Sequence, residues 1–157
     1  MSMQSPSRPA RSSRPSKPSF THRAATVLSV LGGLACLWFG VNFLFAPEAA
    51  ASGFGIPSWP EGQAAGYFAV KAARDLANGA VILTLLALGR RRSLAWVMLL
   101  LAIVPFGDAA AVLAHGGTYA AALGIHAATG ALVLLTAGLL FATSARESVR
   151  ALDRSPA

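Results

Sequence analysis

The chain has 157 residues, of which 55% are hydrophobic and only 12% are charged. Soluble domains carry about 25% charged residues, so this composition argues against an ordinary soluble domain. The formal net charge of +7 would suit a nucleic-acid partner, but most of the basic residues flank long apolar runs, where they determine membrane topology. We therefore expect the lipid bilayer, and no nucleic acid, as a partner. The single cysteine, Cys36, excludes an internal disulfide and a C-x-x-C redox pair.

The N-terminal segment differs in composition from the rest of the chain. It is rich in Ser, Pro and Arg, and residues 1–22 are predicted as a disordered basic tail. An apolar run over about 24–46 follows and is long enough to span a bilayer. A signal peptide is the alternative, but its apolar region is only about 7–15 residues long, so we interpret this run as a retained helix. Gly32, Cys36 and Gly40 recur at four-residue spacing and are expected to allow close helix packing.

Later apolar runs predict the remaining membrane spans. Pro47 is expected to end the first helix, before a proline-rich loop that has no Lys or Arg. Pro105 is expected to kink a later helix. The chain is thus predicted as all-α, an integral membrane four-helix bundle over 23–143, with a short cytoplasmic tail over 144–157. The three further spans cover about 64–88, 94–114 and 119–142.

Basic residues predict the orientation. Five precede the first span, three form Arg90–Arg92 in the second connection, and three follow the fourth span, whereas the first and third connections have none. The positive-inside rule then places both termini in the cytoplasm. The chain is expected to be a multi-pass protein of the cell membrane, which is the inner membrane if the source is a bacterium. Nothing in the pattern favours one oligomeric state over another.

The stretch GYFAVKAARDLANG, residues 66–79, places charged residues inside the second apolar run. A charged side chain in lipid costs roughly 3 kcal/mol or more unless it is paired or hydrated. On a helix, Lys71, Arg74 and Asp75 fall within one arc of about 100° together with Tyr67 and Asn78. This polar stripe therefore requires an interior lined by protein.

Polar residues of other spans are predicted at a similar depth, in the outer half of the membrane, from the rise of about 1.5 Å per residue. Lys71 and Asp75 are spaced to pair within the helix, and Arg74 is within expected reach of Asp108. The spacing matches no standard metal site, and no cofactor motif is present, so neither a metal nor a cofactor is expected. The predicted polar binding cluster comprises Lys71, Arg74, Asp75, Asn78, Asp108, His115 and His126.

Several short motifs occur in a characteristic order: FAPE after the first helix, FGIP, YFAVKAARDLANG, PFGD, HGG and GIH. This order resembles an uncharacterised group of small four-helix membrane proteins that is catalogued as a domain of unknown function and is distantly similar to DoxX-like membrane proteins. The resemblance covers about Val27 to Phe141. It implies the same fold and supports the choice of Arg74, Asp75, Asp108, His115 and His126, but it implies no activity.

Three functions are compatible with this pattern. The first is a binding or transport module in which a small polar or amphiphilic molecule meets the polar cluster. The second is a structural or partner-binding membrane protein, whose buried charges only fix the helix register. The third is an enzyme acting on a lipid-soluble substrate, with His115 or His126 as proton carrier beside an aspartate. Enzyme activity has the least support, because no nucleophile or cofactor motif accompanies these residues.

Overall fold

The computed structural model describes residues 19–152, including the side chains up to residue 145. All regular secondary structure in this part is helical, which confirms the all-α fold class. Residues 1–18 of the predicted basic tail, and residues 153–157, lie outside the described part. The helices are α1 (Phe20–Phe45), α2 (Pro47–Ser52), the 3₁₀ helix η1 (Gly62–Ala65), α3 (Gly66–Ala87), α4 (Arg91–Leu101), α5 (Ile103–Ala114), α6 (Tyr119–Ala121), the π-helix η2 (Ala122–Ala127) and α7 (Ala128–Leu152).

Both ends of α1 have local causes in the sequence. The Ser19 hydroxyl accepts a hydrogen bond from the main-chain N–H of His22 at 3.3 Å, which caps the first turn. At the other end Ala46 leaves the helical conformation, and Pro47 then begins α2 rather than an irregular loop. Proline is well suited to a first helical position, and Glu48 places a negative charge in the first turn. The connection predicted as a loop therefore contains a short helix.

The third apolar run forms two helices in line. α4 and α5 are separated only at Ala102, close to Pro105, which has no N–H to donate to the carbonyl oxygen of Leu101. The last helical run begins after a turn in which Gly116 has a φ of +79°. There the Thr118 hydroxyl accepts a hydrogen bond from the N–H of Ala121 at 3.1 Å, which caps α6. α7 then continues into the region predicted as a tail.

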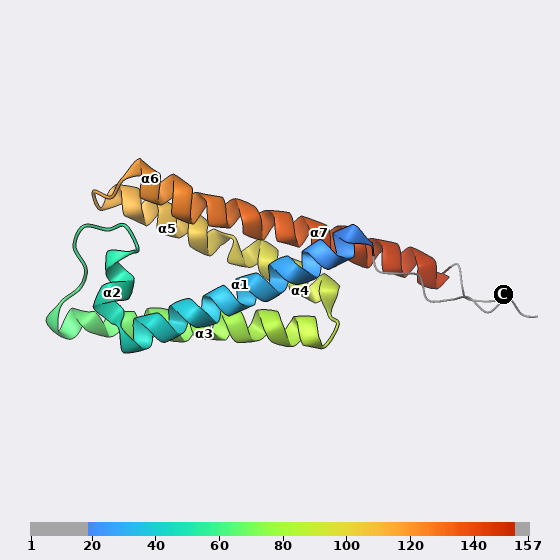
Figure 1. The fold of residues 1–157 in the computed structure, drawn as a ribbon, viewed down its shortest axis with the longest axis horizontal. Helices are drawn as coiled ribbons and strands as arrows, with labels where there is room; N and C mark the ends of the chain where they lie inside the picture. Colours follow the sequence, from blue (N-terminus) through green and yellow to red (C-terminus); the bar gives the residue numbers. More distant parts are fainter. Residues whose placement is uncertain (1–18, 153–157) are drawn as a thin grey trace, which may run out of the picture.

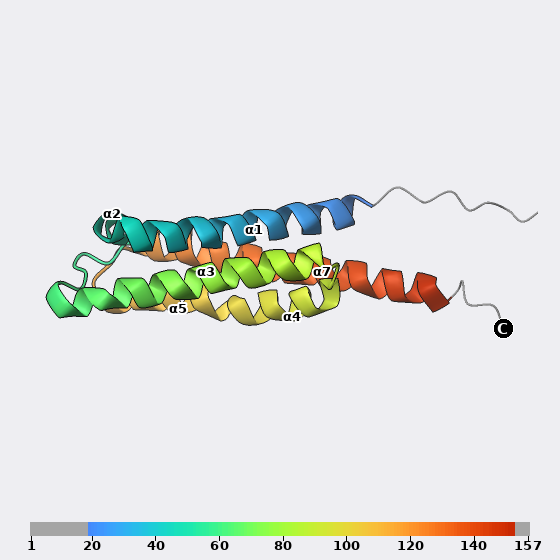
Figure 2. The same ribbon diagram turned by 90° about the horizontal axis from the view of Figure 1, so that it is seen from below.

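The long helices lie roughly side by side (Figures 1 and 2), and their contacts form a closed ring. α1 packs chiefly against α3 and also against α7, whereas α4 packs against α7 and α3. α5 packs mainly against η2. Toward the end of the molecule that carries α2, the pair of α1 and α3 diverges from the pair of α5 and α6 (Figure 1). The beginning of α1, the α3–α4 turn with Arg90–Arg92, and the end of α7 lie toward the opposite end.

Glycines allow the close approach of α1 and α3. A Cβ atom at Gly79 would lie 2.8 Å from the Gly33 carbonyl oxygen, and one at Gly40 would lie 2.6 Å from the Leu76 side chain. The prediction of glycine-mediated packing is therefore confirmed at Gly40 but not at Gly32 or Cys36. Gly33, not Gly32, faces α3, while Gly32 and Cys36 line the interior cavity described below.

Three helical stretches are long and apolar enough to cross a membrane: Phe20–Phe45, Arg91–Ala114 and Tyr119–Ala145. α3 is not among them, and it carries Lys71, Arg74 and Asp75. Many large apolar side chains on the outer surface are exposed, among them Val27, Leu100 and Ile103. Helices that are apolar toward the outside as well as toward the core are typical of membrane proteins. The fourth span and the orientation of the termini stay predictions.

Candidate functional site

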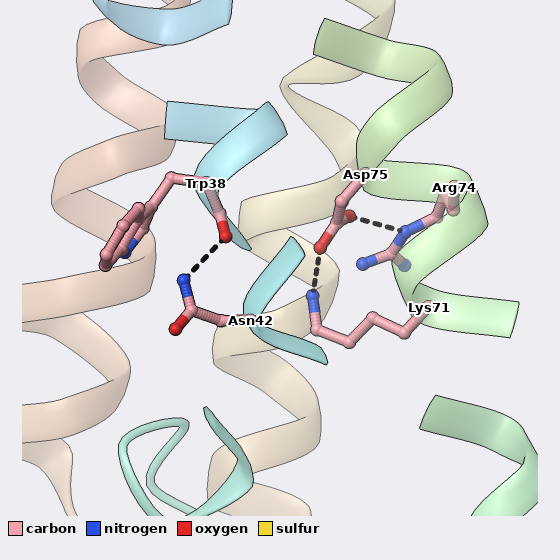
Figure 3. Close-up of polar contacts among 5 residues, drawn as sticks. All are labelled: Trp38, Asn42, Lys71, Arg74 and Asp75. Atoms are coloured by element: carbon pink, nitrogen blue, oxygen red, sulfur yellow. Dashed lines mark hydrogen bonds and ion pairs between the residues drawn. The ribbon is translucent and has the colours of Figure 1, made fainter. Parts of the chain in front are cut away.

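A charged triad occupies one face of α3. The carboxylate of Asp75 accepts hydrogen bonds from the Lys71 ammonium at 2.7 Å and from Nε of Arg74 at 3.2 Å (Figure 3). Asp75 is buried, with 7% of its surface exposed, whereas the side chain of Arg74 is 41% exposed. Lys71 and Asp75 form the in-helix pair that the sequence predicts. Both ion pairs join residues of the same helix, so they do not link α3 to another helix.

Aromatic rings complete the surroundings of the Lys71 ammonium. It lies 4.5 Å from the ring centre of Phe43 on α1 and 5.4 Å from that of Phe54, just after α2. A cation near an aromatic face is attracted by the negative potential of the ring, and this attraction increases when water is excluded. Lys71 thereby contacts both α1 and the segment that follows α2, which reduces the cost of holding its charge inside the protein.

The polar face of α3 lines a cavity with a volume of about 440 Å³. This volume lies within the range of small-molecule sites, roughly 300–1,000 Å³. α1, α3, α4, α5, η2, α7 and the segment around α2 all contribute to its wall. Six of the seven predicted site residues line it: Lys71, Arg74, Asp75, Asn78, Asp108 and His126.

The cavity has a polar end and an apolar end. Asn42 near the end of α1, Lys71 near the start of α3, and His126 in η2 all lie toward α2. Further along these helices, toward the basic end of the molecule, the wall consists of small or apolar residues. These are Gly32, Ala35, Ile82, Met98, Leu101 and Val133. The cavity therefore matches a molecule with a polar head and an apolar body.

Asp108 lines this cavity with no hydrogen-bonding partner among the described side chains. Across residues 19–145 its carboxylate makes no hydrogen bond or ion pair, and the same holds for the Asn78 side-chain amide. The expected ion pair between Arg74 and Asp108 is not formed; Arg74 bonds through Nε to Asp75. Asp108 is thus a half-buried carboxylate that presents unused acceptor capacity toward the cavity.

His126 lines the polar end of the cavity and lies at a local irregularity of its helix. It lies in the π-helix η2, and π-helical turns are frequent at functional sites. Its Nε2 lies 2.7 Å from the main-chain oxygen of Phe54, and the two rings are centred 4.6 Å apart. A carbonyl oxygen only accepts, so Nε2 carries the proton. We call Phe54 and α2, which this bond ties to η2, the cap of the cavity.

His115 lies outside the cavity. It is exposed at the end of α5, where its Nδ1 donates to the carbonyl oxygen of Ala111 at 2.8 Å. The structure therefore separates this residue from the other predicted site residues. Among the residues that the structure describes, no group of three or more His, Cys, Asp and Glu side chains is placed to hold a metal ion.

The aromatic part of the site was not anticipated from the sequence. Phe39 and Phe43 continue the face of α1 that begins with Gly32 and Cys36, at helical spacings of three and four residues. This periodicity could have assigned them to the interior. No sequence signal identifies Phe54, because its main-chain oxygen, rather than its side chain alone, contacts His126.

Comparison with known proteins gives one match. Residues 33–140 match the family described as Domain of unknown function (DUF4267). No curated protein and no solved structure matches the chain. The resemblance to an uncharacterised family is confirmed, while the similarity to DoxX-like proteins stays a prediction. Since the match covers most of the chain and includes the six predicted site residues that line the cavity, this protein belongs to the DUF4267 family.

Proposed function

We propose that this protein is a four-span membrane protein of the cell membrane, with both termini cytoplasmic, that binds a small amphiphilic molecule in its interior cavity. The fourth span in this proposal is α3. Its outward face carries Val70, Ala73, Ala77 and Val81, all exposed, whereas its charged residues gather on the cavity side. A helix that is apolar outside and polar inside suits a bilayer and not water.

The observation that carries the binding proposal is the unpartnered carboxylate of Asp108 beside an apolar chamber. The net positive charge of the triad balances the charge of Asp108, but a carboxylate held away from water still needs hydrogen-bond donors, and leaving it without them is costly. We place the ligand head group at the polar end, beside Asp108. The apolar residues around Cys36, Met98 and Val133 would meet the rest of the ligand.

A purely structural role is the alternative. It would require the buried charges to connect helices, as ion pairs that fix the helix register do. Here both ion pairs of Asp75 stay within α3, and only the ring contacts of Lys71 reach other segments. This arrangement favours binding over a structural lock. Transport would be a further step beyond binding and requires the cap to open.

The native cysteine offers a direct test. Cys36 lines the cavity, within electrostatic reach of the charged triad, and is the only thiol in the chain. We would reconstitute the full chain in phosphatidylcholine nanodiscs and measure the rate of its alkylation by N-ethylmaleimide, with and without decanamide. If the cavity binds amphiphiles, decanamide slows the reaction in a saturable manner. A rate that stays constant up to the solubility limit of decanamide would favour the structural alternative.

A further inference from the structure

Four charged side chains line the cavity, and their formal charges cancel. Asp75 bonds to both Lys71 and Arg74, so this triad retains one positive charge. The carboxylate of Asp108 supplies one negative charge at the same polar end. His126 donates through Nε2 to Phe54, which a neutral imidazole does as well as a charged one. With a neutral His126, the site has no net charge.

The same residues offer both kinds of hydrogen-bonding group. Asp108 provides an acceptor, and Arg74 bonds to Asp75 through Nε only, so its two terminal nitrogens make no hydrogen bond within residues 19–145. Asn78 provides an unused amide, which can donate and accept. A head group placed between Arg74 and Asp108 would thus have to accept on one side and donate on the other.

We propose, building on the proposed function, that the cavity selects amphiphiles whose head group is uncharged and carries both a hydrogen-bond donor and an acceptor, as in a primary amide or a monoglyceride. Such a head donates to Asp108, accepts from Arg74, and leaves the charge balance intact. An anionic or cationic head would introduce an uncompensated charge into a site of low dielectric constant, which is costly.

The size of the cavity limits the apolar part of the ligand. A volume of about 440 Å³ is roughly three times that of a 150 Å³ cavity that holds one benzene molecule, so it has room for roughly 15–18 non-hydrogen atoms. A polar head of three or four atoms then leaves room for one chain of roughly ten carbons. That chain would lie along Cys36, Met98, Leu101 and Val133.

Three probes with the same ten-carbon chain test the head-group preference: decanamide, decylamine in its protonated form, and decyl sulfate. Each is titrated into nanodiscs that contain the full chain, and its binding is read from the protection of Cys36 against N-ethylmaleimide. We expect decanamide to protect at concentrations at least tenfold lower than either charged probe. In the wild-type protein, the neutral probe should therefore protect Cys36 at the lowest concentration.

Two substitutions should change this order in opposite directions. Asp108→Asn leaves the site with one net positive charge, so decyl sulfate should become the best protector. Arg74→Gln leaves one net negative charge, so decylamine should become the best. Arg92→Gln is the matched control, because Arg92 is exposed and does not line the cavity. It should retain the wild-type order.

The outcomes separate the two proposals. Protection by none of the probes overturns the proposed function together with this inference. Protection of the wild-type protein that is strongest with a charged probe, or an order unchanged by both substitutions, overturns the head-group inference alone. Should Arg74→Gln fail to fold, Asp108→Asn decides the question, because the Asp108 carboxylate has no hydrogen bond within residues 19–145 to lose.

Discussion

Nε2 of His126 lies 2.7 Å from the main-chain oxygen of Phe54, although 72 residues separate the two in the chain. This hydrogen bond joins η2 to the segment after α2 at the polar end of the cavity. Ring contact adds to it, since the Phe54 ring lies against the imidazole and near the Lys71 ammonium. The cap is therefore held by interactions that can be weakened one at a time.

Replacing His126 with Phe should loosen the cap. The substitution retains an aromatic ring beside Phe54 but removes the only donor to its carbonyl oxygen among the described residues. A neutral hydrogen bond contributes about 1 kcal/mol net, which corresponds to about a fivefold change in an equilibrium. We expect Cys36 to react with a water-soluble maleimide about five times faster in His126→Phe than in the wild-type protein, as measured in nanodiscs by mass spectrometry.

The matched control for this measurement is His115→Phe. His115 is exposed and bonds to Ala111 of its own helix, outside the cavity. The His115→Phe substitution should leave the alkylation rate of Cys36 unchanged. Equal rates in the wild-type protein and both variants would mean that the contact between Phe54 and His126 does not limit access to the cavity.

The sequence predicted the helical class and the charged residues that line the cavity, because both depend on patterns along single helices. The polar stripe of α3 follows from helical periodicity alone, and Lys71 indeed pairs with Asp75. The sequence did not reveal which residues of different helices contact each other. Arg74 was expected to reach Asp108, but Asp75, as its immediate neighbour in the chain, bonds to it instead.

Irregular backbone explains the other differences. Residues 119–142 were predicted as one regular helix, but η2 inserts a π-helical turn that contains His126. The cap depends on a main-chain oxygen, which every residue possesses, so the composition of the loop gives no hint of it. Gly33 rather than Gly32 faces α3, since spacing alone does not determine which row of small residues meets the neighbouring helix.

The charged triad predicts an order of stabilities. Asp75→Asn removes the shared partner of two cations, and an uncompensated buried charge costs about 3–5 kcal/mol. Lys71→Met should cost less, because Asp75 retains Arg74. Arg74→Gln should cost least, since its side chain is 41% exposed and partly hydrated. Thermal unfolding of the three variants in detergent should therefore give melting temperatures that rise in this order.

A double substitution separates charge effects from packing effects. Lys71→Met combined with Asp75→Asn leaves Arg74 as the one cation of the triad, on its more exposed side. We expect the double variant to be more stable than Asp75→Asn alone, although it carries one more substitution. If the stability lost in the double variant equals the sum of the losses in the two single variants, the Lys71 ammonium does not depend on Asp75 for its stability.

Glycine packing between α1 and α3 predicts a contrast between two substitutions of the same kind. Gly79→Ala places a Cβ atom 2.8 Å from the Gly33 carbonyl oxygen, so the helices must separate, and overpacking typically costs about 1–3 kcal/mol. Gly138→Ala in α7 is the control, because a Cβ atom there meets nothing within 4 Å. It should leave the melting temperature unchanged or raise it, since alanine favours helix. Equal effects at both positions would contradict close packing at Gly79.

Topology can be measured at two serines that flank α3. Ser58 lies between α2 and η1, and Ser93 lies in the first turn of α4 beside Arg90–Arg92; both are exposed. In a Cys36→Ala background, we expect Ser58→Cys to react with a membrane-impermeant maleimide on intact cells. Ser93→Cys should react only after permeabilisation, because basic connections stay in the cytoplasm.

Each other outcome of the labelling experiment has a distinct meaning. Labelling of Ser93→Cys alone would reverse the orientation but keep α3 as a span. Labelling of both cysteines, or of neither, on intact cells would place them on the same side of the membrane. Only α3 and the short η1 lie between the two positions, so α3 would then not cross the bilayer. Its triad would no longer need a protein-lined interior within the membrane, and the four-span proposal would fail at this helix.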